Sequence, residues 1–149
     1  IISVVQGSIG KKGMVLNCES RRTHNIFTED GIEHDYLHMD GQEVYKFAVR
    51  QCPKCLLEAL EKADMTADDI DYFVLHQANV RIIESVAKRL KAPVEKFPMT
   101  LGYTGNMSAA SVPVMLDSLV RDGGLKRGDK VAMSAFGAGL TYGAIVLEW

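Results

Sequence analysis

The chain has 149 residues, of which 47% are hydrophobic and 24% charged, and its formal net charge is -2 at pH 7. This composition is typical of one globular domain and excludes an intrinsically disordered chain. It gives no general attraction to nucleic acid or to an anionic membrane surface, and no apolar run approaches the roughly 20 residues that cross a bilayer.

The cysteines are Cys18, Cys52 and Cys55, an odd number that argues against a secreted disulfide framework and favours a reducing compartment. The first residues, 1–5, lack the charged leader of a signal peptide and resemble a strand already under way. We therefore expect a cytoplasmic protein, and a chain that is a piece of something longer.

Residues 1–6 are apolar and β-branched, which predicts a strand. Residues 11–40 are polar and show no sustained period, so we expect a long surface excursion. Apolar residues then recur at helical spacing over 44–60, with Pro53 expected to kink or restart the helix.

Residues 66–69 predict a capped turn, 72–75 a strand, and 83–90 a helix that ends before Pro93. Residues 97–101 predict a third strand.

A glycine-rich turn then opens a helix from about residue 108 to 120, which Gly123 and Gly124 end. Two last strands, 130–136 and 141–148, flank a tight turn. Alternating strands and helices predict an α/β fold: a five-stranded, mostly parallel sheet with one antiparallel edge strand and helices on its faces. Residues 1–149 are expected to form a single domain.

Three unusual segments follow successive predicted strands. His76 comes directly after the second strand, Asn106 lies after the third, and the glycine-rich turn 137–139 follows the fourth. Taken singly, they indicate a structural histidine, a helix cap and a turn. Because ligands bind beyond the carboxyl ends of parallel strands, their coincidence at one edge predicts a functional site.

Four runs carry a resemblance to a known family: 39–45, 76–82, 105–113 and 135–143. They resemble signature segments of β-ketoacyl-acyl-carrier-protein synthase III, the decarboxylating acyltransferase that starts fatty-acid chains. The resemblance implies the thiolase fold, which has two similar α/β halves around a pseudo-twofold axis. This chain looks like the carboxyl-terminal half.

The resemblance implies a condensation in three parts. An acyl group moves from acyl-coenzyme A to a cysteine, malonyl-acyl-carrier protein loses carbon dioxide, and the resulting carbanion attacks the acyl thioester. The family's histidine and asparagine, which stabilise the enolate, correspond to His76 and Asn106. The backbone N–H of Ala138, where many members carry glycine, would help hold the second oxyanion.

The resemblance also implies binding residues. Arg81 matches an arginine that docks the acidic carrier protein; beside it, Lys88, Arg89 and Lys91 form either an extended basic patch or a solvated helix face. The positions that match the lining of the pantetheine tunnel are Gly41, Tyr45, Asn79 and Ile82.

No segment resembles the family's nucleophile, since Cys18 lies in a polar loop. The nucleophile is therefore expected on a missing amino-terminal half, without which this chain would be inactive. The other expected partners are acyl-carrier protein, coenzyme A thioesters and, in the complete enzyme, a second copy. We expect no cofactor, because the thioesters are substrates, and no metal.

Two alternatives stay open: a non-catalytic module that binds carrier protein or coenzyme A, and half of a starter-specific polyketide synthase. Three further patterns are weaker. Cys52 and Cys55 have redox or zinc spacing but lie on an apolar helical stripe. His34 and His38 have metal-ligand spacing only if helical, and residues 7–13 do not satisfy the phosphate-loop pattern.

Overall fold

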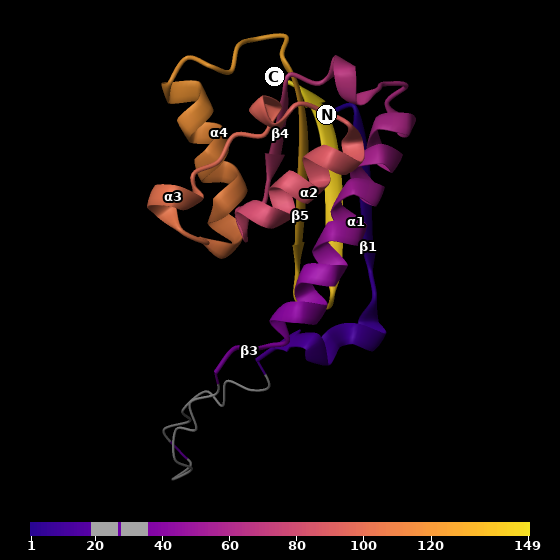
Figure 1. The fold of residues 1–149 in the computed structure, drawn as a ribbon, viewed down its shortest axis with the longest axis vertical. Helices are drawn as coiled ribbons and strands as arrows, with labels where there is room; N and C mark the ends of the chain where they lie inside the picture. Colours follow the sequence, from indigo (N-terminus) through magenta and orange to yellow (C-terminus); the bar gives the residue numbers. More distant parts are fainter. Residues whose placement is uncertain (19–26, 28–35) are drawn as a thin grey trace.

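The computed structural model describes residues 1–18, 27 and 36–149. Its centre is a four-stranded sheet in the order β1-β6-β5-β4 (Figure 1). The four strands are β1 (Ser3–Ser8), β4 (Tyr72–Leu75), β5 (Lys130–Gly137) and β6 (Thr141–Glu148). A separate two-stranded ribbon pairs β2 (Leu16–Asn17) with β3 (His38–Met39).

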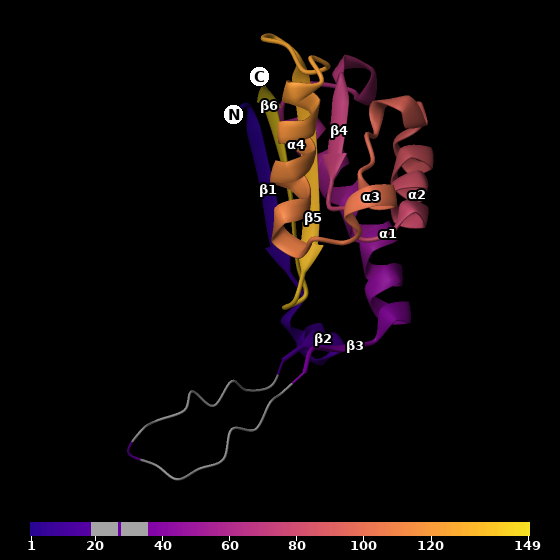
Figure 2. The same ribbon diagram turned by 90° about the vertical axis from the view of Figure 1, so that its left-hand side faces the viewer.

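Helices cover both faces of the sheet. The α-helices are α1 (Gly41–Lys62), α2 (Val80–Leu90), α3 (Leu101–Thr104) and α4 (Ser111–Arg121). Short 3-10 turns are η1 (Gly10–Val15), η2 (Ala67–Asp69), η3 (Val94–Lys96) and η4 (Ser108–Ala110). Helices α1 and α2 pack together on one face and α4 on the other (Figures 1 and 2). None of the described helices is long and apolar enough to cross a membrane.

Strand β4 shows how the core is divided. Its side chains alternate between faces, so Phe73 and Leu75 pack under α1 and α2, whereas Val74 packs under α4 with Met115 and Val131. Since both faces are covered, the strand is a continuous apolar run rather than an alternating one. The α/β class predicted from the sequence is confirmed.

Helix α1 runs unbroken through Pro53, so the expected restart does not occur. Asp40 caps its start, because Oδ1 accepts hydrogen bonds from the backbone N–H groups of Gln42 and Glu43. An interior proline costs about 3 kcal/mol. Burying each large apolar side chain, such as Leu56 or Leu60, returns about 1.5–3 kcal/mol, so packing of the whole stripe outweighs the proline.

The predicted strand at 97–101 is wrong, and the main sheet therefore has four strands instead of five. The alternating apolar side chains that suggested a strand pack inward, with Phe97 stacked on Phe73 at 4.6 Å between ring centroids. Pro98 has no N–H for a ladder, and the N–H of Thr100 donates to the side-chain Oε1 of Gln77.

The sheet is also mixed rather than mostly parallel. Among the described strands, β4 and β5 are the one parallel pair, and β6 lies inside the sheet, antiparallel to both β5 and β1. The predicted antiparallel edge strand, 141–148, is thus an inner strand, and the antiparallel edge strand is β1. Strand β6 is an inner strand because β1 pairs with its free side, from Ser3 opposite Val146 to Ser8 opposite Thr141. This pairing joins the two ends of the chain.

The parallel pair places the ends of β4 and β5 at one edge of the sheet, because parallel strands end on the same side. The β5–β6 turn lies at this edge too, and η1 is joined to it by a hydrogen bond of 2.8 Å from the N–H of Ile9 to the carbonyl of Leu140. Figure 2 shows the β2–β3 ribbon beyond the same end of the sheet. These loops frame the candidate site.

Neighbouring leucines on α1 test this packing. Leu56 is fully buried, whereas the side chain of Leu57 is 49% exposed. Leu56→Ala should lower the free energy of unfolding by about 2–5 kcal/mol, because it leaves a cavity in the core. The control Leu57→Ala should cost less than about 1 kcal/mol. Urea unfolding followed by circular dichroism measures both, and equal losses would contradict this assignment of the core.

Candidate active site

A cavity of about 700 Å³ lies at the edge where β4 and β5 end. Its wall combines the β4–α2 loop, the segment before α4, the β5–β6 turn and the start of α1. The sequence-predicted residues that line it are His76, Asn106, Ala138, Gly41, Tyr45, Asn79 and Ile82. The structure therefore brings together seven of the eight residues singled out from the sequence.

His76 is held at the cavity by the sheet. Its backbone N–H donates to the carbonyl of Ser134 at 2.9 Å, which extends the β4–β5 pairing by one residue. The imidazole packs edge-on against Phe136, with 5.3 Å between ring centroids. Burial lowers the pKa of His76 below its usual value of 6.5. At neutral pH the ring is therefore uncharged, with one N–H donor and one acceptor nitrogen.

Asn106 presents a donor because a backbone group already occupies its oxygen. The N–H of Ser108 donates to Oδ1 of Asn106 at 2.9 Å, which leaves the Nδ2 amide as the group that can donate to a ligand. Gly105, with φ of 66° and ψ of -164°, turns the chain into this position, and this conformation is open almost only to glycine. The loop therefore places a single amide donor at the cavity wall.

Asn79 repeats this arrangement at the start of α2. Its Oδ1 accepts a hydrogen bond of 2.8 Å from the N–H of Arg81 and so caps the helix. The side-chain NH₂ is the part of Asn79 that can serve a ligand. The side chain of Asn79 therefore both caps α2 and lines the cavity.

The β5–β6 turn carries Ala138. Its carbonyl accepts a hydrogen bond of 3.0 Å from Oγ1 of Thr141. Gly139 follows with φ of 134°, and a Cβ there would lie 2.7 Å from Cγ2 of Thr141. A glycine is therefore required beside Ala138, and it keeps the turn tight.

An aromatic cluster forms part of the cavity and was missed as such from the sequence. Phe136 and Tyr142 both line the cavity, and both pack edge-on against Phe47 of α1, at 6.3 and 6.1 Å between centroids. Phe136 and Tyr142 lie in the run 135–143, but a single strand position gives no sign of which aromatic neighbours it will meet.

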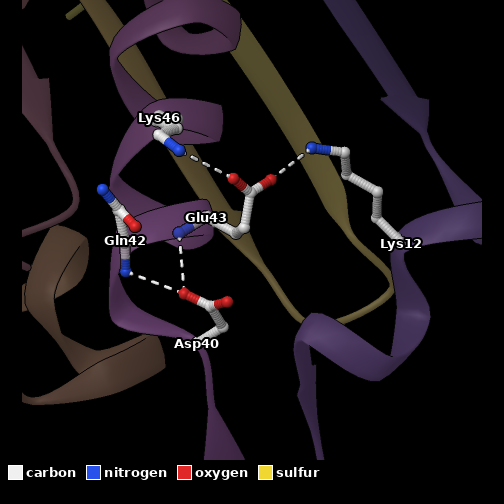
Figure 3. A network of polar contacts seen from close by, with 5 residues as sticks. All are labelled: Lys12, Asp40, Gln42, Glu43 and Lys46. Atoms are coloured by element: carbon white, nitrogen blue, oxygen red, sulfur yellow. Dashed lines mark hydrogen bonds and ion pairs between the residues drawn. The ribbon is translucent and has the colours of Figure 1, made fainter.

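The start of α1 is fixed by the ion pairs in Figure 3. The carboxylate of Glu43 lies 2.9 Å from the amine of Lys12 and 3.0 Å from that of Lys46, and it therefore ties η1 to the first turn of the helix. Both lysines hold the pKa of Glu43 at about 2. Gly41, Val44 and Tyr45 line the cavity from the same turn.

Arg81 does not line the cavity. It is exposed in the first turn of α2, next to Ile82, which does. Lys88, Arg89 and Lys91 are exposed as well, as both the basic patch and the solvated face require. Arg81 and Lys88 are seven residues apart and so lie on one face of α2, about 10 Å apart along the axis.

The redox or zinc reading of Cys52 and Cys55 is disfavoured by burial. Both thiols lie in the core, and desolvation raises the pKa of Cys52 to about 12 and raises that of Cys55. Thiols in this state are poor nucleophiles and poor ligands. The proposed pair of His34 and His38 falls partly outside the described residues, because His34 is not described. Among the described side chains, no cluster suited to a metal ion is found.

Comparisons with known proteins agree on one family. The model described as 3-oxoacyl-acyl-carrier-protein (ACP) synthase III, C terminal, matches residues 60–149. A β-ketoacyl-acyl-carrier-protein synthase III of Microcystis aeruginosa is 52% identical over 113 residues, which cover 76% of this chain and 34% of that protein.

Solved structures give the same result. The 3-oxoacyl-acyl-carrier-protein synthase III of Aquifex aeolicus superposes with a TM-score of 0.88 at 34% identity, covering 100% of this chain and 44% of the other. The priming β-ketosynthase of a polyketide pathway gives a TM-score of 0.85 at 37% identity, covering 97% and 43%. The chain spans less than half the length of the relatives it matches.

The Glu43 ion pairs make a testable pH prediction. In Lys12→Met the carboxyl loses its largest stabilising partner, so its pKa should rise from about 2 toward 4.5. Nuclear magnetic resonance titration of the labelled carboxyl measures this shift. Because the folded-state pKa is depressed, any stability from the pairs is present above about pH 4.5 and is lost as the pH falls toward 2.

Lys54→Met serves as the control, since Lys54 is an exposed lysine on the same helix that takes no part in these ion pairs. It should leave the titration of Glu43 unchanged. An unshifted pKa in Lys12→Met would contradict the ion-pair network.

Proposed function

The chain belongs to the family of 3-oxoacyl-acyl-carrier-protein synthase III carboxyl-terminal domains, and on this premise we propose that it is the decarboxylating half of a β-ketoacyl-acyl-carrier-protein synthase III. In this proposal, residues 1–149 form one thiolase-like half-domain. Its site decarboxylates malonyl-acyl-carrier protein and condenses the product with an acyl group from acyl-coenzyme A, which initiates fatty-acid synthesis. The observation that carries the proposal is that one cavity holds both His76 and Asn106.

The first step needs two donors and no carboxylate. As the bond to the malonyl carboxylate breaks, its electron pair moves into an enolate, and negative charge develops on the thioester oxygen. The neutral imidazole of His76 donates one hydrogen bond to that oxygen, and Nδ2 of Asn106 donates the other. No Asp or Glu lines the cavity in the part of the chain that the structure describes, so nothing there opposes the charge.

The second step joins two carbons. The enolate carbon attacks the acyl thioester carbonyl, the carbonyl electrons move to its oxygen, and the backbone N–H of Ala138 helps hold that oxyanion. The electrons then return and the cysteine thiolate leaves. That cysteine belongs to the amino-terminal half in this proposal, since Cys52 and Cys55 are buried in the core and Cys18 does not line the cavity.

The remaining wall suits a thioester arm. Gly41, Tyr45 and Ile82 supply apolar and backbone surface, and Asn79 supplies an amide donor that can face the amides of pantetheine. Arg81 is exposed in the first turn of α2, two residues after Asn79, where it can contact an acidic carrier protein. These five roles stay proposals.

The proposal includes the wider setting. The partners are the amino-terminal half, acyl-carrier protein and coenzyme A thioesters, and two complete copies assemble as a homodimer in the cytoplasm. We propose no cofactor, because the malonyl carboxylate supplies the electron pair for the new bond. Without the other half, the chain lacks its nucleophile and cannot condense.

A second candidate is the corresponding half of a priming ketosynthase in polyketide synthesis. The 37% identity to such an enzyme favours it as a specific alternative. The chemistry at His76 and Asn106 is unchanged, and only the acyl starter differs. Competition between acetyl-coenzyme A and longer acyl-coenzyme A starters distinguishes the two.

The donor pair is tested by substitution, with the amino-terminal half supplied. His76→Ala and Asn106→Ala should each slow decarboxylation of the malonyl thioester by about 10²–10³-fold, because each removes one oxyanion donor. Asn106→Asp should be at least as slow, since a carboxylate of similar shape repels the enolate. Release of ¹⁴C-labelled carbon dioxide measures the rate.

The exposed Lys54→Ala is the control and should retain the rate of the unmodified protein. If His76→Ala and Asn106→Ala also retain it, the catalytic proposal is wrong. In that case the non-catalytic binding module becomes the better reading, and binding of the malonyl thioester without turnover would support it.

A further inference from the structure

Building on the proposed function, we propose that Gln77, Thr100 and Thr104 are positioning residues that fix the separation of the two donors. Their hydrogen bonds form a continuous path. It starts at the carbonyl of Leu75, the last residue of β4 and the one before His76, and it ends at the carbonyl of Gly105, the residue before Asn106. None of the three lines the cavity.

Gln77 forms the first link. It follows His76 directly, is fully buried, and both ends of its amide are used. Nε2 lies 3.0 Å from the carbonyl of Leu75 and 3.4 Å from that of Pro98, and Oε1 accepts from the N–H of Thr100 at 3.1 Å. A buried amide that satisfies groups on two segments locks them together, because separating them leaves polar groups unpaired.

Thr100 and Thr104 form the second link. Thr100 is fully buried, and Oγ1 of Thr104 lies 3.0 Å from its carbonyl and 3.3 Å from its hydroxyl. The same Oγ1 lies 3.0 Å from the carbonyl of Gly105, which belongs to the peptide unit that continues into Asn106. The single proton of this hydroxyl is shared between carbonyls on either side of α3.

The geometry around α3 explains why such a link is needed. The helix has only four residues, and a single turn is not stable by itself. No residue of α3 is buried, and Tyr103 is 74% exposed. The position of Asn106 is therefore set by the buried anchor at Gln77 and Thr100, carried across α3 by Thr104.

The test uses the complete enzyme with both halves. Thr104→Val removes the hydroxyl and keeps the shape, and it should lower kcat for decarboxylation by about tenfold to 100-fold, because small displacements of a catalytic group cost this much. The KM for the malonyl thioester should stay the same. Thr104→Ser restores the hydroxyl and should recover most of kcat. Gln77→Met should act in the same direction.

Ser118→Ala is the matched control. Its hydroxyl also donates to a backbone carbonyl, that of Val114 at 3.0 Å, but on α4 and outside the cavity lining. It should lower thermal stability about as much as Thr104→Val does and leave kcat unchanged.

The outcomes separate this inference from the proposed function. If His76→Ala and Asn106→Ala slow the reaction but Thr104→Val does not, the positioning role is wrong. Equal losses in Thr104→Val and Thr104→Ser would also overturn it, because the hydroxyl would then not matter. If none of the site variants changes the rate, the proposed function itself fails. Should Gln77→Met not fold, Thr104→Val and Thr104→Ser decide.

Discussion

The site depends on the parallel pairing of β4 with β5. Leu75 lies opposite Ser134, and the N–H of His76 continues that register onto the carbonyl of Ser134. A slip by one residue would turn every side chain of β4 to the other face of the sheet, so that each would meet the wrong helix layer. The buried Phe73 and Val74, which pack on opposite faces, prevent such a slip. The core thus sets where the imidazole stands.

Backbone hydrogen bonds decide which end of each cavity amide is available. At Asn79 and Asn106 alike, a main-chain N–H two residues later occupies the side-chain oxygen. The local turn therefore orients the amide before any ligand arrives, and both side chains offer donors. Together with an imidazole kept neutral by burial, this gives a wall that favours a developing negative charge without carrying a full positive one.

Local sequence patterns predicted much of this structure. The strands 72–75 and 141–148 agree with β4 and β6, and the capped turn at 66–69 agrees with the hydrogen bonds of Thr66 to Asp69. The convergence of His76 and Ala138 followed from the rule on strand ends, because they come directly after β4 and β5, whereas Asn106 reaches the cavity from the segment after α3, without the strand predicted before it. The pairing of β1 with β6 did not follow, because register between chain ends leaves no local signal. The strand prediction for 97–101 failed for a related reason. The N–H of Thr100 donates to the side chain of Gln77 instead of to a neighbouring strand, and the spacing of apolar residues does not show such a partner.

The two core cysteines have a practical consequence for chemical labelling. Their thiols are protonated at neutral pH and shielded by α1 and the sheet, so alkylating reagents reach them only after unfolding. Cys18 is exposed, but it lies outside the cavity lining. Labelling of Cys52 or Cys55 under mild conditions would therefore report that the packing of α1 against the sheet has opened.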